Sequence, residues 1–209
     1  MASQNTTREP LNRDVIVQHT LTLIENHGIA GFRLKDLAGR LDVTIPNLYR
    51  HFKNRDDIVY SALADDYIAM CAAMSTRIND VASRLTTSVD LLTALRRSEA
   101  EAAGPSLTRR RTTRLQALAA VGGHERSDEI QSALHNVHVA IENLYVRAQK
   151  EGLVDEKYSA RVLTLITSSM LTGIAVTEVD PLIASAEDNL WDVLAVFLLS
   201  LRPTDRVAQ

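Results

Sequence analysis

Three side chains in the run TIPNLYRHF, residues 44–52, have the chemistry needed to recognise bases in DNA: Ile45, Asn47 and Arg50. Arginine pairs in a bidentate manner with guanine, asparagine pairs with adenine, and an aliphatic side chain contacts the methyl group of thymine. The run therefore predicts direct readout of base edges, provided that a helix presents these three side chains on one exposed face.

Two short helices separated by a tight turn are predicted to position these residues. Across residues 34–41, apolar side chains recur at i, i+3, i+4 and i+7, which is the pattern of an amphipathic helix. After a turn at residues 42–43, Thr44 can cap a second helix through its hydroxyl. Pro46 then falls in the first turn, where no backbone N–H is needed. Such a pair is a helix-turn-helix, whose second helix enters the DNA major groove.

The run from residue 43 to residue 63 also resembles the signature of TetR-family transcriptional repressors. In that family the recognition helix ends in a cluster of aromatic residues and histidine, followed by a short loop, a basic residue and a long helix. The matching residues here are Tyr49, His51, Phe52, Lys53 and Arg55, with Gly28, Ile29, Gly31, Phe32, Leu37 and Ala38 upstream. The close match covers roughly the first quarter to third of the chain.

Three positions depart from the family pattern without removing the motif. Asp42 stands in the turn where the family usually has glycine, but aspartate is among the few residues that tolerate a positive φ. Arg33 replaces the usual Thr or Ser cap of the first motif helix, while Asp36 in its first turn complements the helix dipole. Arg55 replaces the usual lysine after the loop and keeps its charge.

The motif and the resemblance together predict a set of DNA-contacting residues. The resemblance places the Tyr-His cluster and the two basic residues that follow it at backbone phosphates. The full set is Arg33, Lys35, Thr44, Ile45, Pro46, Asn47, Tyr49, Arg50, His51, Lys53 and Arg55. Nearer the N-terminus, Arg8 and Arg13 could reach phosphates or a minor groove, or could belong to a solvated tail.

Composition excludes several other classes of protein. A chain of 209 residues with 45% hydrophobic residues, 8 Gly and 5 Pro suits one large or two small helical domains. The single cysteine excludes an internal disulfide framework. With no signal peptide and no apolar run long enough to span a membrane, the sequence indicates a cytoplasmic protein.

The distribution of charge is consistent with DNA binding, although the net charge is −3. Residues 1–56 carry 8 Lys and Arg against 6 Asp and Glu, while residues 57–209 carry 15 against 20. A basic head on an acidic body suits a DNA-binding protein, because attraction to phosphates supplies much of its non-specific affinity.

Apolar periodicity predicts helices along the whole chain and hence an all-α fold. The resemblance implies a three-helix helix-turn-helix head at residues 1–54, together with the start of the long helix that follows, and a helical bundle for ligand binding and dimerisation at residues 55–209. The expected helices span residues 12–27, 34–41, 44–52, 55–84, 88–103, 106–121, 128–150, 158–179 and 187–201.

A run of four arginines from Arg109 to Arg114 could touch DNA or acidic groups of the head, or could form a solvated helix face.

The last two expected helices are apolar on most faces and therefore need to be covered on most sides. Hydroxyl-bearing residues and Gly173 interrupt the helix at residues 158–179, whereas residues 187–201 are nearly apolar throughout. The resemblance implies that the two helices form a four-helix bundle with a second subunit; a core within one chain is the alternative. The predicted interface consists of Leu163, Ile166, Met170, Ile174, Leu190, Trp191, Leu194, Phe197 and Leu198.

A pocket for a small organic molecule is predicted in the body, between the helices at residues 55–84 and 128–150. Adaptable methionines combined with a few polar groups suit such a pocket, although in an ordinary core they need no ligand. The candidates are Tyr67, Met70, Met74, His138 and Tyr145. His135 and His138, at i and i+3, could instead share a metal ion with Cys71, but this spacing also arises by chance.

Together these features predict a one-component regulator that binds a near-palindromic operator as a homodimer, usually as a repressor, and is released by a small organic effector. No cofactor, metal or membrane is expected. The sequence has no phosphate-binding glycine loop, GxSxG, HExxH or CxxC motif, so no catalytic residues are assigned and an enzyme is not expected. Two other interpretations are a helical interaction module that has lost DNA binding and an all-helical enzyme using His135 or His138.

Overall fold

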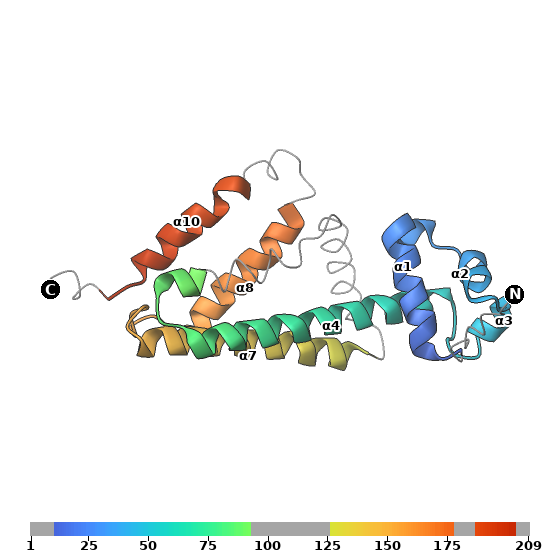
Figure 1. The fold of residues 1–209 in the computed structure, drawn as a ribbon, viewed down its shortest axis with the longest axis horizontal. Coiled ribbons are helices and arrows are strands. Elements are labelled where there is room, and N and C mark those ends of the chain that lie inside the picture. Colours follow the sequence, from blue (N-terminus) through green and yellow to red (C-terminus); the bar gives the residue numbers. More distant parts are fainter. Residues whose placement is uncertain (1–10, 93–125, 178–186, 204–209) are drawn as a thin grey trace, which may run out of the picture. The chain divides into compact units, whose positions relative to one another are not determined.

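The computed structural model describes residues 11–92, 126–177 and 187–203, and every regular element in these ranges is a helix. The prediction of an all-α fold is therefore confirmed. The chain divides into two compact units, Met1–Asp66 and Tyr67–Gln209, called here the head and the body. The helices labelled in Figure 1 are α1 (Arg13–Gly31), α2 (Leu34–Leu41), α3 (Ile45–Leu48), α4 (Arg55–Arg84), α7 (Ser127–Lys150), α8 (Ala160–Thr177) and α10 (Glu187–Ser200).

The predicted helix-turn-helix is present in the head as α2 and α3. The α2 helix has the predicted bounds, and Asp42 directly after it adopts the left-handed conformation, with φ 53 and ψ 49. The turn closes where the backbone N–H of Val43 donates to the carbonyl of Ala38 at 2.9 Å. Pro46 lies in the first turn of α3 as predicted. The prediction of a capping bond is wrong: Thr44 occupies the N-cap position, but its side chain makes no capping hydrogen bond.

The first helix of the head, α1, has a side-chain cap at its start and an interruption near its end. Asn12 caps it, its Oδ1 accepting a hydrogen bond from the backbone N–H of Val15 at 2.9 Å. The helical backbone is interrupted at Gly28, with φ 70 and ψ 168, and a further turn follows as far as Gly31. The side chains of Ile16 and Leu37, one from α1 and one from α2, are fully buried, so the two helices share the core of the head.

The long helix α4 begins at an asparagine cap and belongs partly to the head. Asn54 Oδ1 accepts a hydrogen bond from the backbone N–H of Asp57 at 2.8 Å. The helix has 30 residues, which at 1.5 Å per residue is about 45 Å. Its first turns bury Ile58 and Ala62 completely, and the head unit includes the start of this helix, as far as Asp66.

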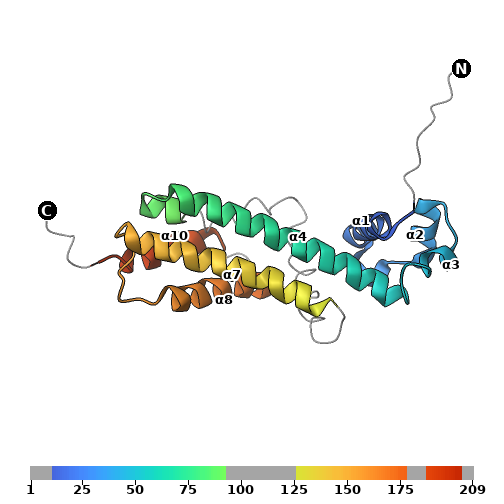
Figure 2. The same ribbon diagram turned by 90° about the horizontal axis from the view of Figure 1, so that it is seen from below.

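In the body, α7 runs beside the second half of α4 in both views, and α8 packs against α7 (Figures 1 and 2). One buried polar contact joins the latter pair: the hydroxyls of Tyr145 on α7 and Thr167 on α8 are hydrogen-bonded at 2.6 Å. Burial raises the pKa of the Tyr145 phenol, so this group stays neutral at physiological pH. The contact fixes the register of α7 against α8.

The connection between α7 and α8 also holds the end of α10. Gly152 closes α7 with φ 69. The side chain of Gln149 donates to the carbonyl of Tyr158 at 2.7 Å across the connection. The backbone N–H of Asp155 then donates to the carbonyl of Leu201 at 2.7 Å, so the last turn of the chain's final described helix is tied to the same loop.

Part of the predicted body lies outside the described residues. Residues 88–92 are helical, but the remainder of the helix expected at residues 88–103, the whole helix at 106–121 and its run of four arginines fall outside the description. Among the helices that the structure does describe, none combines the length and apolar character needed to cross a membrane.

We expect Tyr145→Phe to lower the free energy of unfolding by about 1–3 kcal/mol, because it leaves the buried Thr167 hydroxyl without this partner. Thr167→Val should have an effect of similar size. The double variant should cost less than the sum of the two, because replacing both partners leaves neither buried group unsatisfied. Urea denaturation at one fixed protein concentration measures the free energy of unfolding of the wild type, the two single variants and the double variant. Strictly additive losses would show that the hydrogen bond does not stabilise the packing of α7 against α8.

Candidate DNA-binding surface and ligand pocket

The recognition helix α3 has one buried side and one exposed side. Leu48 is 0% exposed and anchors the helix in the core of the head, while Tyr49 directly after it is 44% exposed. Arg50 is also exposed, whereas Ile45 and Asn47 are half-buried. The three predicted base-reading side chains therefore lie on or beside a solvent-facing surface, as direct readout requires.

None of the predicted DNA-contacting residues is buried. The exposed members of the set are Arg33, Lys35, Thr44, Pro46, Tyr49, Arg50 and Lys53. The half-buried members are Ile45, Asn47, His51 and Arg55. The backbone that carries them is short and irregular around α3, so its position depends on contacts with the rest of the head.

One of these contacts is made by Arg13 at the start of α1. Its Nη1 donates to the carbonyl of His51 at 2.9 Å, and its Nη2 donates to the hydroxyl of Ser61 on α4 at 2.8 Å. The guanidinium also lies over the ring of Phe52, 4.3 Å from its centre, which is a cation–π contact. Arg13 thus joins α1, the end of the recognition helix and α4. It is therefore part of the folded head and not of a solvated tail.

A second arginine makes a similar contact on the other side of the motif. Arg55, in the first turn of α4, donates from Nη2 to the carbonyls of Ile29 at 2.8 Å and Phe32 at 3.2 Å. Its guanidinium lies 5.4 Å from the centre of the Phe32 ring. The phosphate contact of Arg55 stays a prediction; in the structure its Nη2 holds the segment between α1 and α2 against α4.

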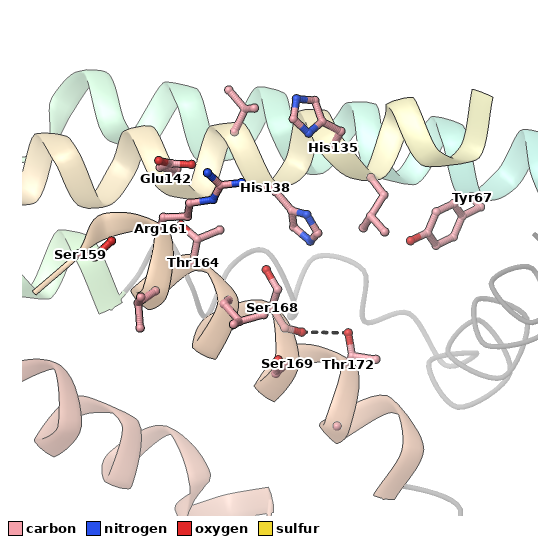
Figure 3. A pocket seen from close by; sticks show the side chains of 15 residues that line it. Tyr67, His135, His138, Glu142, Ser159, Arg161, Thr164, Ser168, Ser169 and Thr172 are labelled. Carbon is pink, nitrogen blue, oxygen red and sulfur yellow. Dashed lines mark hydrogen bonds between the residues drawn. The ribbon is translucent and has the colours of Figure 1, made fainter. Parts of the chain in front are cut away.

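A pocket of about 1100 Å³ lies in the body, mainly between α7 and α8 (Figure 3). The sequence predicted the pocket between α4 and α7. Among the described residues, however, α4 contributes only Tyr67 to its lining. Of the five predicted ligand contacts, Tyr67 and His138 line this pocket. Met70, Met74 and Tyr145 do not, and the Tyr145 hydroxyl is bonded to Thr167 instead.

The two walls of the pocket differ in chemistry. The α7 wall carries His135, His138 and Glu142 among aliphatic side chains, and the α8 wall carries Arg161 and several hydroxyl groups. The hydroxyl-bearing residues were seen in the sequence only as interruptions of an apolar helix. They are Thr164, Ser168, Ser169 and Thr172, and Ser159 directly before α8 also lines the pocket.

The histidine pair does not have the surroundings of a metal site. Burial lowers the pKa of His138, and the nearby charge of His135 lowers it further, so the His138 imidazole is neutral at pH 7. Cys71 is fully buried. Within the described residues, no group of three or more His, Cys, Asp or Glu side chains is placed to hold a metal ion.

The predicted dimer residues differ in how deeply they are buried. Leu163, Leu194 and Leu198 are buried within the chain itself and belong to the core of the body, while Ile166 is 44% exposed. Met170 and Phe197 are half-buried, and the side chains of Ile174, Leu190 and Trp191 fall outside the description. The exposed aliphatic side chains on the two helices are Val162, Leu165, Ile166, Val193, Val196 and Leu199.

Comparison with known proteins supports the assignment of the head. Residues 16–62 match the family described as bacterial regulatory proteins, tetR family. This segment includes α2, α3 and the first turns of α4, so it contains the whole helix-turn-helix. No curated protein sequence matches the chain.

Several solved structures share the fold at low sequence identity. A protein of unknown function from Rhodococcus sp. RHA1 has a TM-score of 0.72 at 14% identity, covering 96% of this chain and 100% of that one. SmeT, the repressor of the multidrug efflux pump SmeDEF of Stenotrophomonas maltophilia, has a TM-score of 0.59 at 17% identity, covering 96% and 94%. A protein from Saccharomonospora viridis, described as a transcriptional regulator in complex with choline, has a TM-score of 0.65 at 17% identity, covering 90% and 93%.

We expect Arg13→Met to destabilise the head by roughly 1–3 kcal/mol, because the carbonyl and hydroxyl that Arg13 bonds lose this donor while an apolar side chain stays near Phe52. Arg13→Lys should recover only part of the loss, since an ammonium lacks the planar fork that reaches both acceptors. Arg33→Met is the matched control, because Arg33 is exposed and its Nη1 bonds the carbonyls of Ala30 and Phe32 within its own segment. An unchanged melting temperature for Arg13→Met would contradict the assignment.

Proposed function

We propose that this chain, whose head carries the DNA-binding domain of the TetR family, is a one-component transcriptional regulator of the cytoplasm. It binds a near-palindromic operator as a homodimer, usually to repress transcription, and a small organic effector releases it. The observation that carries the proposal is the exposure of Tyr49 and Arg50 at the end of α3, next to the buried anchor Leu48.

The DNA contacts of the head fall into two kinds under this proposal. Ile45, Asn47 and Arg50 read base edges, which gives sequence preference. Tyr49 and Lys53 bond phosphates, which fixes the orientation of the head on the duplex without reading sequence. The half-buried state of Ile45 and Asn47 limits how far they reach, so Arg50 carries the greatest share of the base discrimination.

Exposed aliphatic side chains on α8 and α10 support a homodimer. On α10 they recur every three residues, at Val193, Val196 and Leu199, and on α8 they include Leu165 and Ile166. Single exposed aliphatic residues are normal on a surface, but repeated ones along two helices are typical of an interface. Two heads held by one dimer can occupy two half-sites, as a palindromic operator requires.

Effector control follows from the pocket in the body and the helix that belongs to both units. The α4 helix is continuous from Arg55 to Arg84, so it has residues in the head and in the body. An effector in the pocket lowers DNA affinity only if it binds a conformer of the body that disfavours the DNA-bound arrangement of the heads. The choline complex of the regulator from Saccharomonospora viridis supports a small organic effector.

Arg50→Ala should weaken operator binding by about 1–3 kcal/mol and relax base preference at one position of each half-site. Tyr49→Phe should weaken binding to all sequences alike, because a phosphate contact carries no base information. Lys150→Ala, which removes an exposed cation from α7, is the control and should leave DNA affinity unchanged. Selection of bound DNA followed by fluorescence anisotropy measures both effects; unchanged affinity in the Arg50→Ala, Tyr49→Phe double variant would refute this role for α3.

Val196→Glu should convert the dimer to a monomer, because it places an unpaired charge in a surface that dimerisation desolvates. Val196 is 68% exposed within one chain, so the folded protomer can tolerate the change. Loss of the second half-site contact should lower operator affinity by about 10²-fold or more. Val89→Glu is the matched control at a side chain that is 71% exposed. Sedimentation velocity tests the assembly, and a wild-type protein that sediments as a monomer rules the dimer out.

A further inference from the structure

The hydroxyl groups on the α8 wall of the pocket offer more acceptors than donors. Thr164 Oγ1 donates its hydrogen to the carbonyl of Ala160 at 2.9 Å, and Thr172 Oγ1 donates to the carbonyl of Ser168 at 2.8 Å. A hydroxyl has one hydrogen and two lone pairs, so after these bonds each threonine presents only lone pairs to the pocket. The second bond is the dashed line in Figure 3.

Ser168 supplies a hydroxyl of a different kind. Its Oγ is buried from solvent and, among the residues that the structure describes, has no hydrogen-bond partner. Figure 3 shows this side chain pointing into the pocket, toward His138 on the facing wall. A buried hydroxyl without a partner is unfavourable, and a polar group of a bound molecule at this point would remove the penalty.

The α7 wall adds further acceptor capacity. Glu142, when ionised, can only accept hydrogen bonds, and the neutral imidazole of His138 has one donor and one acceptor. Arg161 supplies donors, but it is exposed and lies beside Glu142 at one end of the pocket, with Tyr67 at the other end (Figure 3). The middle of the pocket, around Ser168 and His138, therefore has more lone pairs than hydrogens to share.

Aliphatic side chains complete the lining of the pocket. Leu134 and Val139 come from α7, and Val162 and Leu165 come from α8. A volume of about 1100 Å³ is sufficient for an organic molecule of the size that ligand pockets usually hold. An occupant must therefore match both hydrocarbon surface and a cluster of acceptors.

We propose that this pocket takes an uncharged, amphipathic organic molecule whose polar group donates a hydrogen bond, an O–H or N–H, to the acceptors around Ser168. The proposal rests on the proposed function, in which this pocket holds the effector, and it adds the chemical class of that effector. A carboxylate is disfavoured because its lone pairs would face those of Thr164 and Thr172, and its charge would face that of Glu142.

The test uses two isomeric probes, 1-octanol and heptyl methyl ether, with titration calorimetry on the full-length protein in the absence of DNA. The two molecules have the same atoms, but only the alcohol has a hydrogen to donate. We expect the alcohol to bind about tenfold more tightly, the difference that one hydrogen bond makes. An apolar groove without the acceptor cluster would bind the ether at least as well as the alcohol.

Ser168→Ala should lower the affinity for 1-octanol more than the affinity for the ether, because the alcohol can both donate to Ser168 Oγ and accept from it, whereas the ether can only accept. Ser169→Ala is the matched control: this neighbouring serine also lines the pocket, but it is exposed and its hydroxyl can be replaced by water. The melting temperature of Ser168→Ala should not fall, because the variant removes a buried hydroxyl that has no described partner.

Equal affinities for the alcohol and the ether, or tighter binding of octanoate than of 1-octanol, would overturn the inference. Because these measurements involve no DNA, such a result leaves the proposed regulator in place. Failure of the wild-type protein to bind any specific DNA would instead remove the proposed function and leave the ligand preference standing.

Discussion

The position of the recognition helix depends on the guanidinium group of Arg13. The α3 helix spans only Ile45–Leu48, and a helix this short has too few internal hydrogen bonds to be stable by itself. Arg13 holds its end by bonding the carbonyl of His51 and the hydroxyl of Ser61 on α4, with Phe52 against the guanidinium face. A planar group with donors in a fixed arrangement suits this task better than a lysine, because it satisfies several partners in one geometry.

The same requirement for satisfied polar groups organises the body. Where α7 and α8 are in contact, the hydroxyls of Tyr145 and Thr167 satisfy each other at 2.6 Å. Along the pocket, the hydroxyls of Thr164 and Thr172 are satisfied within their own helix, and Ser168 Oγ has no described partner. Polar groups between these helices thus fix the register in the core and, under our proposal, recognise a ligand in the pocket. Any effect of a pocket ligand on DNA binding must be reciprocal, because both are equilibria of one chain.

The local features of the head could be predicted from sequence because each depends on residues a few positions apart. The bounds of α2 follow from the spacing of its apolar residues. The left-handed turn at Asp42 and the cap at Asn54 follow from side chains that suit those backbone positions. The failure of Thr44 as a capping group marks the limit of this reasoning, since a suitable residue in the suitable place need not form the bond.

Sequence alone thus determined the all-helical fold, the helix-turn-helix and the residues that face solvent on it. Tertiary structure alone decided which cations serve the fold, because the partners of Arg13 are 38 and 48 positions away and those of Arg55 reach back 26. It also decided where the pocket lies. Periodicity gives the faces of one helix, but a cavity needs faces of two or three helices, and their packing placed Ser168 opposite His138 while it used Tyr145 in the core.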